Sequence, residues 1–105
     1  MTDAVVVLVT APSAEVAASI ARALVEERLA ACGNVLPGLR SIYRWQGKVQ
    51  EDAEALLILK TQRKRFGELR DRVLALHPYE VPEVLALPVE AGSEPYLDWI
   101  AQSMY

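Results

Sequence analysis

The chain has 105 residues, of which 52% are hydrophobic and 24% charged, and its formal net charge is -3. This length and composition predict one soluble globular domain, residues 1–105. The mild acidity argues against nucleic acid, which requires a basic face. No apolar run reaches the roughly 18 residues that a transmembrane helix needs, and the amino terminus lacks a basic signal segment. We therefore expect a cytoplasmic protein without a membrane partner.

The first half of the chain predicts a strand, a helix and a long hairpin. Residues 5–9, VVVLV, form a continuous and mostly β-branched apolar run, typical of a strand that is covered on both faces or lies at the centre of a sheet. Ser13 is a good N-cap for a helix that should end near residue 29 or 30. A strand is expected from Val35 to Trp45, with a bulge at Pro37-Gly38, and a turn at QGK leads into a return strand over residues 49–60. Arms this long would extend beyond a compact core and need something to pack against.

The second half predicts a helix, a strand and a terminal helix. Thr61 should open a helix that ends at His77-Pro78, because the residue before proline avoids helical backbone. Residues 81–89 are expected to form the fourth strand, and Ser93-Glu94-Pro95 to start a short last helix. The order is β-α-β-β-α-β plus one helix. We therefore predict an α+β fold of the ferredoxin-like type with a long hairpin between the second and third strands.

Several motifs then resemble one family. They are TAP (10–12), LAACGN (29–34), SIYRWQGKVQEDAE (41–54), LKT (59–61), HPYEVPE (77–83) and YLDW (96–99). Their order and spacing are similar to those of the CutA family, the divalent-cation tolerance proteins. The resemblance implies a homotrimer in which the long hairpin reaches neighbouring subunits and joins their sheets. It also implies a role in tolerance of copper and other divalent cations.

The same resemblance raises the question of a copper site. Some family members bind copper through a cysteine in the first strand and two adjacent histidines, at positions that here are Val9, Leu76 and His77. Only His77 can ligate a metal. In a trimer, three copies of His77 could meet, or His77 could combine with Glu80 or Cys32 from a neighbour. In the alternative interpretation His77 ends a helix, where the dipole favours its charged form, and Cys32 is a small buried apolar residue.

Other side chains within the motifs suggest an intersubunit cleft. The candidates are Tyr43, Trp45, Tyr79 and Trp99, with Glu54 and Lys60 as polar contacts for a small ligand. Packing at an interface is the alternative. Asp52, Glu54, Glu80 and Glu83 could be metal ligands, an acid/base pair or partners in salt bridges.

Three functions are compatible with these observations, and one of them is a structural trimer whose main property is its stability. We expect a non-enzymatic trimer that binds copper or another divalent cation weakly, because no motif of a catalytic family is present. The alternative is a PII-like signalling or scaffold trimer that binds a small ligand or a protein partner in its clefts.

Overall fold

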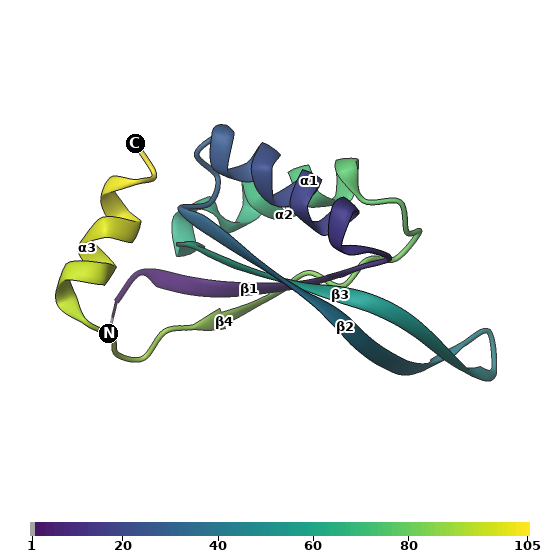
Figure 1. The fold of residues 1–105 in the computed structure, drawn as a ribbon. Coiled ribbons are helices and arrows are strands. Elements are labelled where there is room, and N and C mark those ends of the chain that lie inside the picture. Colours follow the sequence, from purple (N-terminus) through teal and green to yellow (C-terminus); the bar gives the residue numbers. More distant parts are fainter. Residues whose placement is uncertain (1) are drawn as a thin grey trace.

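The chain folds into one sheet with two helices on one of its faces and a third helix at one end (Figure 1). This computed structural model describes residues 2–105, so Met1, which the predicted domain includes, lies outside the described residues. The elements are β1 (Ala4–Ala11), α1 (Ala14–Glu26), β2 (Cys32–Trp45), β3 (Lys48–Gln62), α2 (Phe66–Leu76), β4 (Leu85–Pro88) and α3 (Glu94–Gln102). A single 3-10 turn, Arg63–Arg65, precedes α2. The predicted α+β class and the predicted order of elements are confirmed.

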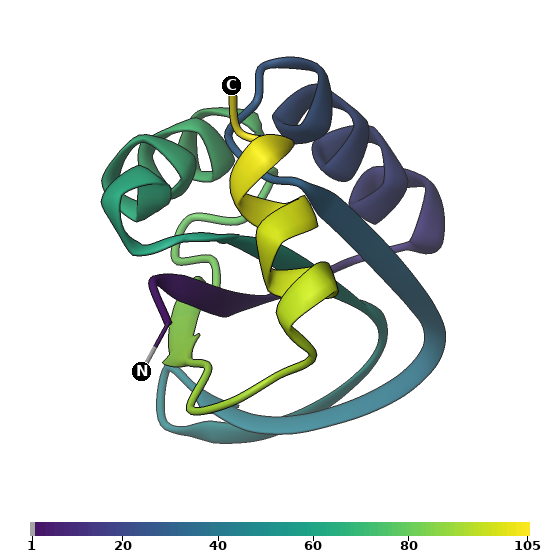
Figure 2. The same cartoon turned by 90° about the vertical axis from the view of Figure 1, so that its left-hand side faces the viewer.

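The sheet has the strand order β2-β3-β1-β4, and every neighbouring pair is antiparallel. The run of valines lies in β1, between β3 and β4, so the prediction of a central strand is confirmed. Val5, Val7 and Val9 are buried under the helices, whereas Val6 and Leu8 are only partly buried. One face of β1 therefore belongs to the core beneath α1 and α2, and the opposite face is buried only at Ala4, which packs beside α3 (Figure 2).

The core between the sheet and the helices combines large apolar side chains with one close approach between two small residues. Ile20 and Leu24 of α1 and Leu69 and Val73 of α2 are buried against the valines of β1. Gly33 lies beneath α1, where an added Cβ would come within 2.8 Å of the Ala21 Cβ atom. Any side chain at this position would push α1 away from the sheet.

Several predicted boundaries differ from the structure, and β2 already begins at Cys32 instead of Val35. The first helix ends at Glu26 instead of residue 29 or 30, and Arg28 has a φ of 60°, a left-handed conformation that ends the helix. The predicted start of the second helix at Thr61 was wrong. Thr61 is a buried residue of β3 that pairs with Val5 of β1, and helix α2 begins only at Phe66. The Thr61 hydroxyl donates to the Leu29 carbonyl oxygen at 2.7 Å, a tertiary contact that favours the strand. The fourth strand covers only Leu85–Pro88, because residues 81–84 form no ladder with β1.

The β2–β3 hairpin is long, as predicted, and it extends past the helices (Figure 1). The expected irregularity lies between Leu36 and Leu39, where Gly38 has a φ of 85°. The first six residues of β3 are exposed, and alternating burial begins only beyond them. The chain measures 44 × 25 × 23 Å, and the distal half of the hairpin supplies much of its long axis. Ile42 and Val49, on its two arms, are 66% and 65% exposed.

The last helix, α3, packs at the opposite end of the sheet from the hairpin tip (Figure 1). Ile100 and Met104 are buried there with Ala4 and Ala31, in a second small cluster. None of the helices within residues 2–105 is both long and apolar enough to cross a membrane.

Candidate functional site

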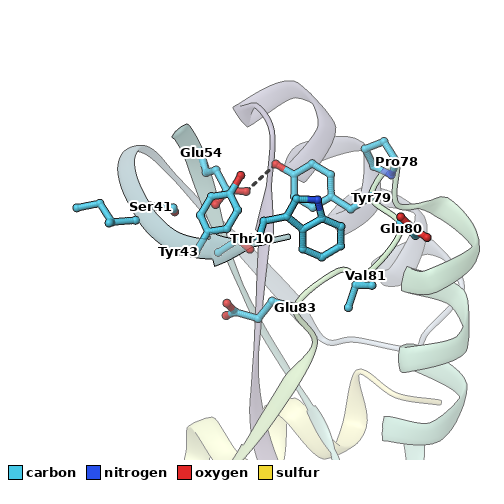
Figure 3. Close-up of a pocket in the computed structure, with 11 residues that line it drawn as sticks. Thr10, Ser41, Tyr43, Glu54, Pro78, Tyr79, Glu80, Val81 and Glu83 are labelled. Carbon is cyan, nitrogen blue, oxygen red and sulfur yellow. Dashed lines mark hydrogen bonds between the residues drawn. The ribbon is translucent and has the colours of Figure 1, made fainter. Parts of the chain in front are cut away.

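A pocket of about 650 Å³ lies where the hairpin meets the segment that follows α2. The hairpin supplies Ser41, Ile42, Tyr43, Trp45 and Glu54, β1 supplies Thr10, and the other wall consists of Pro78, Tyr79, Glu80, Val81 and Glu83. In Figure 3 Tyr43 and Glu54 lie on one side of Tyr79 and Glu80 lies on the other. The volume is in the range of small-ligand sites.

Two tyrosines bind carboxylates of β3 at this site. The Tyr79 hydroxyl donates to Glu54 Oε2 at 2.6 Å (Figure 3), and the Tyr43 hydroxyl donates to Asp52 Oδ2. Partial burial, followed by the hydrogen bond to Glu54, raises the pKa of Tyr79 well above its ordinary value. The hydrogen bond to Asp52 is the main cause that raises the pKa of Tyr43. The raised pKa values hold both phenols in their protonated form.

The pocket is acidic. Glu54, Glu80 and Glu83 line it, and no lysine, arginine or histidine is among its lining residues. The ion pairs within residues 2–105 use other carboxylates, namely Glu27, Glu51, Glu68 and Asp71. Glu54, Glu80 and Glu83 thus take part in none of the ion pairs found within residues 2–105.

His77 is the C-cap of α2 and is only 7% exposed. Its Nδ1 atom accepts a hydrogen bond from the Tyr79 backbone N–H at 3.1 Å, so the ring proton is on Nε2, which lies 2.7 Å from the Thr10 carbonyl oxygen. The ladder between β4 and β1 ends at Leu8. Beyond that point, the bond from His77 to Thr10 attaches the segment after α2 to β1. Both ring nitrogens are occupied by the backbone, and a metal could bind only if one of these bonds opened.

Cys32 lies far from His77. It pairs with Lys60, which in turn pairs with Val6, four residues before Thr10 on β1. At roughly 3.3 Å per residue this spacing is about 13 Å, too far for the two side chains to share a metal ion within one chain. The Cys32 thiol is 3.6 Å from Asn34 Oδ1 and 3.8 Å from Lys60 Nζ.

The structure brings together four of the six predicted cleft residues. Tyr43, Trp45, Glu54 and Tyr79 line the pocket, with Glu80 from the predicted metal ligands. Lys60 lies instead beside Cys32, and Trp99 stacks on Tyr96 of α3 with ring centroids 5.5 Å apart. Within residues 2–105 no three His, Cys, Asp or Glu side chains converge as a metal site. One chain alone does not supply a complete set of ligands.

The sequence analysis did not single out several lining residues. They are Thr10, Ser41, Ile42, Pro78 and Val81. All five lie in the motifs TAP, SIYRW and HPYEVPE, and the last two of these motifs also contain candidate residues. Side-chain chemistry could not have indicated them, because these residues shape the walls without a charge or an aromatic ring.

The fold and the pocket define a class: an α+β domain with an extended hairpin and an acidic, aromatic-walled pocket at the base of that hairpin. A family model described as "CutA1 divalent ion tolerance protein" matches residues 5–103. The chain belongs to the CutA1 family of divalent ion tolerance proteins, as the sequence motifs predicted.

Similar proteins come from distant organisms. The "Divalent-cation tolerance protein CutA" of Thermus thermophilus is 61% identical over 98 residues, which are 93% of this chain and 95% of that protein. The human "Protein CutA" is 55% identical over 94 residues, 90% of this chain but only 52% of the human protein, so the chain spans about half of that relative. The crystal structure of CutA from Xylella fastidiosa covers 99% of this chain and all of its own, with 41% identity and a TM-score of 0.96.

Proposed function

We propose that the chain acts as a homotrimer of ferredoxin-like subunits in the cytoplasm. The distal hairpin supports this assembly. Its arms are exposed on both sides and carry Ile42 and Val49, which a neighbouring copy would bury. The face of the sheet opposite α1 and α2, with the exposed Leu85 and Leu87 of β4, offers further surface to a neighbour. Burial of these apolar side chains between copies would add to the stability of each subunit.

The role that we propose for this trimer is weak, conditional binding of copper or another divalent cation, without catalysis. One observation carries the proposal: the pocket collects Glu54, Glu80 and Glu83, with no basic residue among its walls. A single chain holds no complete cluster within residues 2–105, so ligands from a second copy would complete the site. This arrangement favours modest affinity, because the site exists only in the assembly.

Of the other candidate ligands, His77 would join such a site only after releasing the Tyr79 N–H or the Thr10 carbonyl oxygen. Cys32 would have to come from another copy, because within one chain it lies at the other end of the β1 ladder. Glu80, which has the metal-binding oxygens and lines the pocket, is the candidate that needs no rearrangement.

A copper titration against a competing chelator tests the proposal, with bound metal counted per trimer. We expect saturation at a whole-number ratio and weaker binding in Glu80→Gln. Glu26→Gln, on α1 and outside the pocket, removes the same charge and should bind as the wild type does. Equal binding by all three proteins would contradict a site at the pocket. His77→Ala, measured in parallel, reports whether the imidazole takes part.

A second function is supported by the size of the pocket and its rings. A volume of about 650 Å³ with Tyr43, Trp45 and Tyr79 in its walls suits an organic molecule better than a bare ion. We propose as the alternative a PII-like signalling or scaffold trimer that binds a small ligand or a protein partner in its clefts. This alternative predicts that a small molecule raises the melting temperature while divalent metals do not.

A further inference from the structure

The pocket at the base of the hairpin combines two features that together restrict its ligand. The first is an apolar, aromatic surface. Tyr43 and Trp45 come from β2, and Tyr79 comes from the segment after α2. The hydroxyls of both tyrosines are directed to carboxylates, which leaves the ring faces as the available surface. Aromatic faces accommodate methylene groups and attract cations.

The second feature is that the negative charges are distributed around the rings. Glu54 belongs to β3, whereas Glu80 and Glu83 belong to the opposite wall. In Figure 3 Glu54 and Glu80 lie on opposite sides of Tyr79, and Glu83 lies apart from both. Within residues 2–105 no three His, Cys, Asp or Glu side chains converge on one point, and this holds for the three glutamates of the pocket as well. The pattern is that of several separate anions around an apolar floor.

We propose that this pocket binds a linear aliphatic amine that carries two or more protonated amino groups. Each ammonium group would donate hydrogen bonds to a different carboxylate, and the methylene chain between them would lie on the rings of Tyr43, Trp45 and Tyr79. Glu54 accepts one hydrogen bond from Tyr79 and retains lone pairs for an N–H donor. Within residues 2–105 no three His, Cys, Asp or Glu side chains are placed to hold one compact ion together, whereas a flexible chain of several ammonium groups needs no such convergence. The inference rests on the second proposed function, that of a small-ligand pocket, and names the class of ligand.

The two tryptophans make the test direct, because Trp45 lines the pocket and Trp99 lies on α3. In a Trp99→Phe protein, Trp45 is the sole indole reporter. Spermidine, 1,4-diaminobutane and n-butylamine are titrated at fixed ionic strength while its fluorescence is followed, with MgCl₂ as a control for charge. We expect a saturable change whose affinity falls from spermidine to the diamine and about tenfold further for the monoamine, since one charged contact is lost. Calorimetry on the unsubstituted chain checks that the Trp99 substitution has not created the site.

Charge variants separate a built site from general attraction. Glu54→Gln and Glu83→Gln should each weaken spermidine binding by about threefold to tenfold. Glu26→Gln removes one charge from α1, outside the pocket, and should leave the affinity unchanged. Equal weakening by all three variants, or equal affinity for spermidine and MgCl₂, would overturn the proposal, because attraction to net charge would then explain the binding. The absence of a saturable response would overturn it as well.

Failure of this inference can be told from failure of the functions on which it builds. Light scattering and the copper titration are run on the same preparation. A trimer that binds copper but no polyamine refutes the inference and leaves the metal function in place. A trimer that is stabilised by another small molecule, but not by these amines, refutes the ligand class and leaves the ligand pocket.

Discussion

Substitution of His77 by alanine is expected to destabilise the protein in the absence of any metal. The imidazole is 7% exposed and makes two hydrogen bonds, from Nε2–H to the Thr10 carbonyl oxygen at 2.7 Å and from the Tyr79 N–H to Nδ1 at 3.1 Å. At about 0.5–1.5 kcal/mol for each bond, the loss is about 1–3 kcal/mol of the free energy of unfolding. Alanine would remove both bonds and leave the Tyr79 N–H to find water.

Urea denaturation, with the chelator EDTA present and the protein concentration held fixed, measures this loss. Leu74→Ala is the control: it also truncates a side chain of α2, but Leu74 is exposed, so the change should be smaller. Unchanged stability in metal-free His77→Ala, together with loss of copper binding, would refute the reasoning. His77 would then be a ligand and not the residue that attaches the segment after α2 to β1.

Three further predictions concern packing and protonation. Gly33→Ala should lower the free energy of unfolding by about 1–2 kcal/mol in urea denaturation, because the added Cβ would crowd Ala21. This cost exceeds the gain of about 0.4–1 kcal/mol from a stiffer unfolded chain. A stabilised variant would contradict the close approach. Leu57→Ala should cost about 2–5 kcal/mol in the same assay, since this fully buried side chain leaves a cavity, and a loss below about 1 kcal/mol would show that the core relaxes around it. In an ultraviolet titration Tyr105, whose pKa the nearby Lys64 lowers, should ionise before Tyr79, whose pKa is raised. The stabilisation from protonated Tyr79 should be complete below the ordinary tyrosine pKa of about 10 and lost as the pH rises through the raised pKa of Tyr79. If Tyr79 ionised before Tyr105, this result would contradict the bond to Glu54.

The elements that could be predicted from the sequence are those with local causes. Ser13 accepts from the Val16 N–H at 3.1 Å and caps α1, as its side chain and position indicated. Gly38 adopts the positive φ that a bulge beside Pro37 suggested. The helix start at Thr61 was wrong because its cause is tertiary: pairing with Val5 and the bond to the Leu29 carbonyl oxygen keep Thr61 in the strand.

The site was predictable in part for the same reason. Tyr43 and Glu54 belong to one hairpin, and the motif around Tyr79 is distinctive, so these residues could be selected without knowing their distances. The role of His77 depends on the Thr10 carbonyl oxygen, which is 67 positions away, and no periodicity reports such a contact. Lys60 looked equally suited to the cleft, but its register opposite Cys32 places it elsewhere on the sheet.

The central claim is that the exposed hairpin serves an assembly of copies, and the mass of the protein in solution tests it most directly. Light scattering on the size-fractionated, metal-free chain at micromolar concentration should give three times the chain mass of 11.6 kDa. A mass of one chain would contradict the account, because the arms of the hairpin and the carboxylates of the pocket would then have no neighbouring copy to complete them.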